Sequence, residues 1–194
     1  MLIAKGKVEN MKRKTRTKKL ILCSLFSSLI AIGAFIKVPI PVVPFTLQFL
    51  FTNLAGLLLG RKLGSASVGL YVILGLVGLP IFTGGGGIGY ILQPTFGYLI
   101  GFIAGSWVSG YIIEKTKNPS LKTYIIAGFL NLIVVYLLGM VYYYVIANYY
   151  INSPITVWGL ILYCFILAVP GDILICFVSS ILAKRLYPII KGEV

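Results

Sequence analysis

The sequence contains no histidine and few acidic or sulfhydryl groups. Histidine's absence excludes the zinc motifs and the acid-base catalysis that depend on an imidazole. The three cysteines lie within apolar runs and without Cys-x-x-Cys spacing, so they predict neither a disulfide framework nor a metal cluster. No Gly-x-x-x-x-Gly-Lys-Ser/Thr motif occurs. We therefore expect no catalytic residue, no metal, no cofactor and no ATP site on this chain.

Charged residues are scarce as well, at 11% of the 194 positions, whereas 59% of the positions are hydrophobic. An average soluble domain carries about one-quarter charged residues, so this composition argues against a water-soluble fold. One helical membrane crossing needs about 20 apolar residues. The sequence thus predicts an all-α integral membrane protein with almost no domain outside the bilayer.

Apolar runs separated by glycine, proline and charged residues predict six transmembrane helices. They cover residues 20–36, 45–60, 64–80, 95–113, 121–148 and 155–183. We predict a basic tail (1–19), a membrane-embedded domain (20–186) and a short second tail (187–194). The tail resembles the start of a signal peptide, but no Ala-x-Ala exit follows the first apolar run, so we expect it to be retained.

The distribution of basic residues predicts the orientation. An N-terminus in the cytoplasm places 16 of the 17 lysines and arginines on the cytoplasmic side and only Lys37 outside. The net charge of +13 therefore reflects membrane topology and does not predict a nucleic-acid partner. We expect both termini in the cytoplasm of a multi-pass protein of the cell membrane.

Asp172 is the one acidic residue inside an apolar run. An ionisable group in that position is costly unless it is paired or hydrated, which favours a functional role. The alternative is a helix cap, because Pro170-Gly171 precedes Asp172 and could restart a kinked helix.

The glycine run predicts an anion-binding or carbonyl-binding site on the outer face. Gly84, Gly85, Gly86 and Gly87 can turn unhindered N–H groups toward an anion, and the helix that opens after Thr95 adds further free N–H groups. The alternative is a flexible surface loop. The formal Gly-x-Gly-x-x-Gly match lacks a strand-helix-strand context and is discarded.

Two amides and one set of small residues complete the candidates. Gln48 and Gln93 can donate and accept hydrogen bonds, either to a ligand or between helices. On the first predicted helix, small residues one turn apart permit close approach of another helix, from a partner or from the same bundle. These residues are Ser24, Ser27, Ser28 and Ala31.

Several ordered stretches resemble the BioY family, the biotin-binding S components of energy-coupling-factor (ECF) transporters. They are VPFTLQ (43–48), GLVGLPIF (75–82), GGGGIGY (84–90), PTFGYLIGF (94–102) and Pro170-Gly171-Asp172. The resemblance extends from about residue 20 to residue 186. It implies an S-component-like bundle of six helices, with a pocket open to the outside and covered by the first and second outer loops.

The resemblance also implies the ligand and the partners. Biotin would bind through Asp172 and Gln48 or Gln93 at its ureido ring, with Tyr90 and Tyr98 burying its apolar parts. A transmembrane coupling subunit and two ATPase subunits, which alone bind ATP, would complete the transporter. The family contacts its coupling subunit through small residues of the first helix, a role that falls here to the serines and the alanine named above.

One position departs from the family pattern. Members commonly carry a lysine three residues after the aspartate, where this chain has Ile175. The carboxylate of biotin is therefore expected at the glycine N–H groups and the helix that follows Thr95. Other readings are an S component for thiamine or riboflavin, a biotin transporter that works alone, or a lipid-modifying membrane enzyme, which would need more acidic residues.

Overall fold

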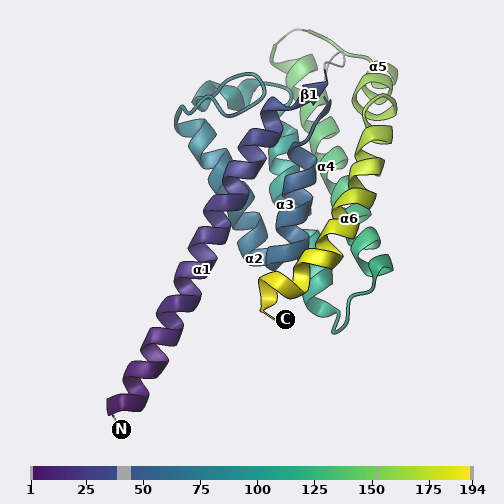
Figure 1. Ribbon diagram of the computed structural model, residues 1–194. Coiled ribbons are helices and arrows are strands. Elements are labelled where there is room, and N and C mark those ends of the chain that lie inside the picture. The colour runs from purple at the N-terminus through teal and green to yellow at the C-terminus, as the bar shows by residue number, and fades with distance from the viewer. Residues whose placement is uncertain (1, 39–44, 152, 193–194) are drawn as a thin grey trace.

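The protein folds into a bundle of long helices with two very short strands at one end (Figure 1). The computed structural model describes residues 2–38, 45–151 and 153–192, and only the backbone of residues 2–15 and 191. Most of the predicted first outer loop, residues 39–44, lies outside the described residues. The elements are α1 (Leu2–Phe35), β1 (Lys37–Val38), β2 (Phe45–Thr46), α2 (Gln48–Val77), the 3-10 helix η1 (Ile88–Leu92), α3 (Phe96–Lys115), α4 (Leu121–Tyr149), α5 (Val157–Ile161), the π-helix η2 (Leu162–Ile166) and α6 (Val169–Lys191).

Five helical stretches among the described residues are long and apolar enough to cross a membrane. They are Arg16–Phe35, α2, α3, α4 and Val157–Ile190, which joins α5, η2 and α6. The predicted spans 45–60 and 64–80 both belong to α2 for most of their length, although residues 45–46 form β2 and α2 ends at Val77. The number of crossings therefore depends on the path of α2.

The backbone of α2 breaks at Gly60, where φ is 82° and ψ is 176°. Gln48 Nε2 donates a 2.7 Å hydrogen bond to Tyr71 Oη, although a straight helix would hold residues 23 positions apart at about 35 Å. A Cβ at Gly64 would lie 2.6 Å from the carbonyl oxygen of Ala55, on the other arm. The two arms of α2 therefore run antiparallel and in close contact, as Figure 1 shows.

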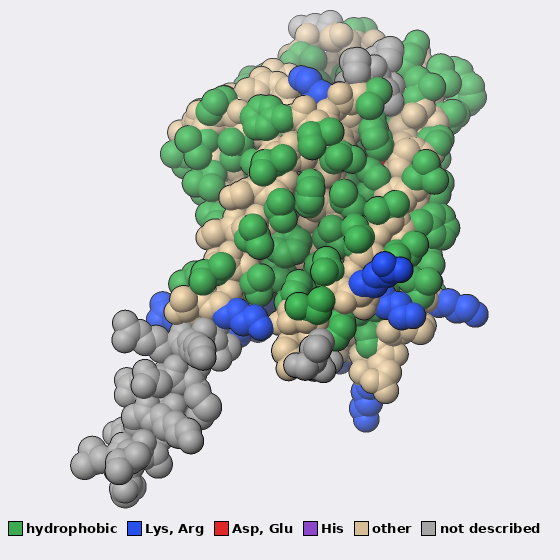
Figure 2. All heavy atoms as spheres, viewed as in Figure 1, with side chains coloured by type: hydrophobic (Ala, Val, Ile, Leu, Met, Phe, Trp, Pro, Cys, Tyr) green, Lys and Arg blue, Asp and Glu red, His purple; other side chains and the backbone are tan. Residues whose placement is uncertain are grey.

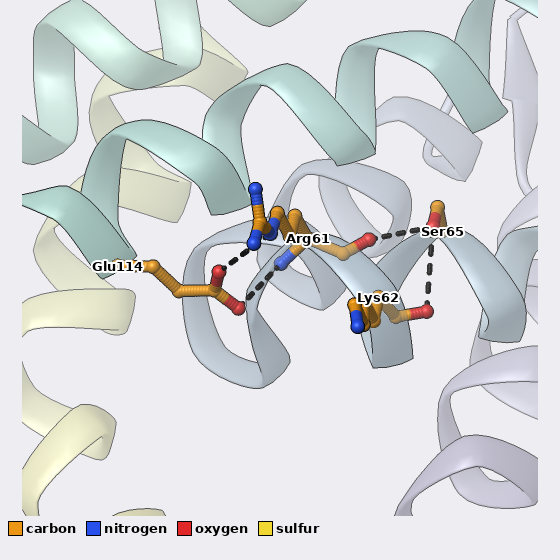
Figure 3. Close-up of polar contacts among 4 residues, drawn as sticks. All are labelled: Arg61, Lys62, Ser65 and Glu114. Carbon is orange, nitrogen blue, oxygen red and sulfur yellow. Dashed lines mark hydrogen bonds and ion pairs between the residues drawn. The ribbon is translucent and has the colours of Figure 1, made fainter.

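Glu114, near the end of α3, holds the turn between the two arms (Figure 3). Its Oε1 accepts a 3.0 Å hydrogen bond from the backbone N–H of Arg61, and its Oε2 lies 3.1 Å from Arg61 Nε. A Cβ at Gly60 would collide with this carboxylate, and the positive φ of Gly60 also favours glycine. Gly60, the last residue of one predicted span, thus makes the tight turn between the two arms possible.

Polar side chains join three helices inside the bundle. Asn131 Nδ2 of α4 donates to Asn53 Oδ1 of α2 at 2.9 Å, and Asn53 Nδ2 donates to Ser179 Oγ of α6 at 2.8 Å. All three side chains are fully buried. Such interhelical hydrogen bonds stabilise membrane bundles, where the hydrophobic effect contributes little to helix association.

Charge separates the two ends of the molecule. Lysine and arginine side chains gather below a broad apolar surface, at the end that holds the C-terminus (Figure 2). At that end Lys18 Nζ donates to the carbonyl of Ile190 at 2.7 Å. The strands β1 and β2, the second loop and the start of α3 lie at the opposite end (Figure 1).

Candidate ligand-binding site

A cavity of about 590 Å³, including its opening, lies inside the bundle near the end that carries the strands. Residues from β2, α2, α3, α4, α6 and the loop after α2 contribute to its wall. The lining residues are Phe45, Thr46, Gln48, Phe49, Thr83, Tyr90, Thr95, Tyr98, Leu99, Phe102, Val135, Tyr136, Ala168 and Asp172.

Asp172 is the one acidic residue that lines the cavity, and it is 9% exposed. It lies in the first turn of α6, where the helix dipole favours a negative charge. The cap position of α6 is Ala168, and no side chain caps this helix. The alternative that Asp172 serves as a helix cap is therefore wrong, because its side chain is directed to α4 instead.

Tyr136 of α4 is the partner of Asp172 and was not among the residues singled out from the sequence. Its hydroxyl donates a 2.5 Å hydrogen bond to Asp172 Oδ2. No hydrogen bond to Asp172 Oδ1 comes from the described residues, so this oxygen remains available to a ligand. The ring of Tyr136 meets that of Tyr98 edge to face at 5.9 Å. Tyrosine rings therefore form the wall around the carboxylate.

Gln48 is 4% exposed and belongs to the same cavity. Its Nε2 donates to Tyr71 Oη, and that hydroxyl donates to the carbonyl of Ile81 at 3.0 Å. These two hydrogen bonds connect the two arms of α2 to each other and to the following loop. The bond to Tyr71 orients the amide, and among the described residues its carbonyl oxygen and its second N–H have no hydrogen-bond partner.

A second polar group lies where the loop after α2 meets α3. Tyr90 Oη lies 3.1 Å from Thr83 Oγ1 and 3.4 Å from Thr95 Oγ1, in hydrogen-bonding positions. All three residues line the cavity. Five residues predicted from the sequence, on four separate elements, are thus brought to one cavity: Gln48, Tyr90, Thr95, Tyr98 and Asp172.

The glycine run does not form the expected open cradle of N–H groups. Gly85 N–H donates to the carbonyl of Phe82, and Gly87 N–H donates to the carbonyl of Gly75. Gly84, Gly85, Gly86 and Gly87 are not among the cavity-lining residues. A Cβ at Gly86 would collide with the carbonyl of Leu79. The run permits tight loop packing, and two of its four amides are already satisfied within the fold.

Gln93 is exposed and does not line the cavity. At the start of α3, Phe96 N–H donates to the carbonyl of Gln93, and Tyr98 N–H donates to that of Thr95. The structure therefore separates the two predicted amides and leaves Gln48 alone at the site. It also leaves fewer free N–H groups at this helix start than we expected.

Close packing on glycines places β2 and the loop after α2 against the cavity. Phe45 of β2 packs on Gly171, where a Cβ would lie 2.5 Å from its ring. Phe82, which is 2% exposed, fills the space that a side chain at Gly75 would need. These contacts explain why glycine precedes Asp172 and why glycine lies in the last turns of α2.

The four small residues of α1 divide between two faces. Ser24 and Ser28 are exposed, and each hydroxyl donates to the carbonyl four residues earlier. Ser27 is 4% exposed, and Ala31 packs against the core. The outward pair is thus the one that another subunit could reach.

Known proteins share both the sequence and the fold. A model of the BioY family matches residues 9–192. A probable biotin transporter BioY of Lysinibacillus sphaericus is 43% identical over 182 residues, covering 94% of this chain and 93% of that protein. The biotin transporter BioY of Thermotoga maritima is 39% identical over 137 residues, covering 70% and 78%.

The fold is similar to that in a crystal structure of the S-component for biotin from an ECF-type ABC transporter. The TM-score is 0.77 at 28% identity, and the match covers 89% of this chain and 92% of that chain. The homologues and the apolar helices identify a multi-pass protein of the cell membrane. The relatives and the fold are those of a transporter component and not of an enzyme.

Proposed function

Since this chain belongs to the BioY family, we propose that it is the S component of a biotin uptake transporter and binds biotin in the cavity around Asp172. The observation that carries this proposal is the buried carboxylate of Asp172, held by Tyr136 at the wall of an otherwise largely apolar cavity. An ionisable group inside a membrane bundle is costly, so its presence in the cavity wall favours a functional role such as binding a polar ligand.

The polar groups of the cavity are complementary to the ureido ring of biotin. The ring presents two N–H donors and one carbonyl acceptor. Asp172 Oδ1 and the carbonyl oxygen of Gln48 can each accept from a ring N–H. Tyr98 and Phe102 are large and apolar enough to enclose the thiophane ring and valeryl chain.

The proposed topology has six crossings, since each arm of α2 crosses the membrane separately. The break at Gly60 and the contact between Gln48 and Tyr71 support two antiparallel arms. Both termini then lie on the cytoplasmic side, with the basic end of the molecule, and the cavity opens to the outside.

The energy for transport comes, in this proposal, from separate subunits. The sequence has no phosphate-binding motif, so ATP hydrolysis would take place on two ATPase subunits joined through a transmembrane coupling subunit. The exposed Ser24 and Ser28 of α1 are the proposed contact with the coupling subunit, because small side chains allow helices to approach closely.

Replacing Asp172 by asparagine tests the proposed site. Loss of a charged hydrogen-bond partner in a desolvated site costs about 2–5 kcal/mol, so Asp172→Asn should weaken biotin binding about tenfold or more. Calorimetric titration of the purified protein in detergent measures this. Glu114→Gln is the matched control, because Glu114 does not line the cavity and an amide oxygen there can still accept from the N–H of Arg61, so the affinity should be unchanged.

If Asp172→Asn bound biotin as tightly as wild type does, Asp172 would not belong to the binding site. Titrating thiamine and riboflavin in the same experiment decides the ligand. Tight binding of either vitamin, with none of biotin, would contradict the proposed function.

A further inference from the structure

Lys37 is a cation on the strand that borders the cavity, and nothing above assigns it a role. In the register of the two strands it pairs with Thr46, and its Nζ donates a 3.2 Å hydrogen bond to the carbonyl of Thr83. Both threonines line the cavity. Lys37 is exposed, so its ammonium lies between two elements of the cavity wall and is open to solvent.

No carboxylate neutralises this ammonium within the described residues. The sequence has no acidic residue between Glu9 and Glu114. Glu114 is paired with Arg61, and Asp172 is hydrogen-bonded to Tyr136. Of the three donors of the ammonium, the carbonyl of Thr83 uses one. Among the described residues nothing else accepts from the ammonium, which leaves two donors and its positive charge for a ligand.

The other candidates for binding an anion are weaker in this structure. Ile175, at the position where the family commonly has a lysine, is apolar and 6% exposed. The amides of Gly85 and Gly87 donate within the protein, and so do those of Phe96 and Tyr98. A carboxylate gains more from a charged donor than from neutral amides.

We infer that Lys37 binds the carboxylate of the transported ligand and selects for its negative charge. This inference rests on the proposed function, and it completes the site. Asp172 accepts from the N–H groups of one end of the ligand, and Lys37 donates to the anionic other end. The bond to the neutral carbonyl of Thr83 holds the lysine in place until a carboxylate takes over as the stronger partner.

The test compares biotin with its neutral methyl ester, both titrated against wild type and two variants. Wild type should bind the acid about tenfold more tightly than the ester, as expected for one charge-assisted hydrogen bond. Lys37→Met should bind the ester as wild type does but lose the preference for the acid. Lys37→Arg keeps the charge and should retain most of that preference.

Lys62→Met is the matched control, because it removes one exposed lysine at the turn between the two arms of α2. Its ratio of acid to ester affinity should equal that of wild type. Ester binding by Lys37→Met shows that the variant is folded and that its ureido site is intact.

Two results would overturn the inference and leave the proposed function standing. The first is an unchanged preference for the acid in Lys37→Met, and the second is an equal loss of affinity for acid and ester. The second result would make Lys37 a loop tether and not a ligand contact. Failure of wild type to bind either compound would instead reject the proposed function itself.

Discussion

At the scale of single residues, the contact between Tyr136 and Asp172 fixes the one acidic group that lines the cavity. A carboxylate in an apolar bundle needs a hydrogen-bond donor, and the phenol hydroxyl supplies one without adding a charge. This hydrogen bond fixes one oxygen of the carboxylate toward α4, and the other oxygen accepts no hydrogen bond from the described residues.

Removing the hydroxyl should therefore reduce affinity even though Tyr136 need not touch the ligand. We expect Tyr136→Phe to weaken biotin binding about tenfold, because hydrogen bonds to charged groups contribute about 1.5–3 kcal/mol. Tyr149→Phe, on the exposed end of the same helix, is the control and should bind as wild type.

A double variant separates positioning from general damage to the fold. If Tyr136 acts through Asp172, adding Tyr136→Phe to Asp172→Asn should cause little further loss, since the two effects are not additive. Fully additive losses would show that Tyr136 acts independently of the carboxylate.

The sequence identifies Asp172 but not Tyr136, because only Asp172 differs clearly in polarity from its neighbours. One acidic residue in an apolar run is conspicuous, whereas Tyr136 lies among other tyrosines and aliphatic residues of one long helix. Helical periodicity cannot tell the ligand-facing side from the lipid-facing side when both are apolar. The sequence does not identify the pair Asn53 and Asn131 either, because their hydrogen bond depends on which helices are neighbours.

At the scale of elements, α1 presents two different faces. Ser24 and Ser28 lie on an outward face with Ile21, Leu25 and Ile32, which are 50–61% exposed. Ser27 and Ile30 face the core. A surface of small and aliphatic side chains, at helical spacing, suits close packing against another transmembrane helix.

Larger side chains on this face of α1 should weaken the proposed assembly without affecting the cavity. Replacing Ser24 and Ser28 with leucine should lower the affinity for the coupling subunit about tenfold or more, since overpacking costs about 1–3 kcal/mol. Co-purification of tagged subunits measures the association, and biotin titration of the isolated chain should be unchanged.

Ser27→Leu is the control for damage to the fold. It places the same bulk on the buried face, so it should reduce thermal stability of the isolated chain. If the outward pair instead reduced biotin binding while assembly persisted, those serines would belong to the bundle's own structure.

Element boundaries follow from the sequence better than element conformation does. The glycine and basic residues at 60–62 mark the end of one apolar run, and the structure breaks α2 at Gly60. Glycine permits an open cradle of N–H groups at 84–87, and composition alone does not distinguish that cradle from a tightly packed loop. In the structure the N–H groups of Gly85 and Gly87 donate to backbone carbonyls of Phe82 and Gly75.

At the scale of the whole molecule, most of the basic side chains and the cavity lie at opposite ends. The bulk of the basic side chains gathers at the end with the C-terminus, and the strands and cavity-lining loops lie at the other (Figures 1 and 2). The buried contacts among Asn53, Asn131 and Ser179 lock three helices between these ends.

The asymmetry of charge leads to a prediction about orientation, with the cytoplasm at the basic end. Single cysteines report it in a background where Cys23, Cys164 and Cys176 are replaced. Gly89→Cys is suitable for the outer end, because a Cβ there meets open space and Gly89 has no positive φ. Asn118→Cys, exposed between α3 and α4, reports the inner end.

In intact cells a membrane-impermeant maleimide should label Gly89→Cys and leave Asn118→Cys unlabelled until the membrane is opened. The chain without cysteines should stay unlabelled throughout. Labelling of Asn118→Cys from outside would reverse the orientation and place the cavity mouth in the cytoplasm. That result would be incompatible with uptake from an outward-facing pocket, because the ligand would meet the site only after it had crossed.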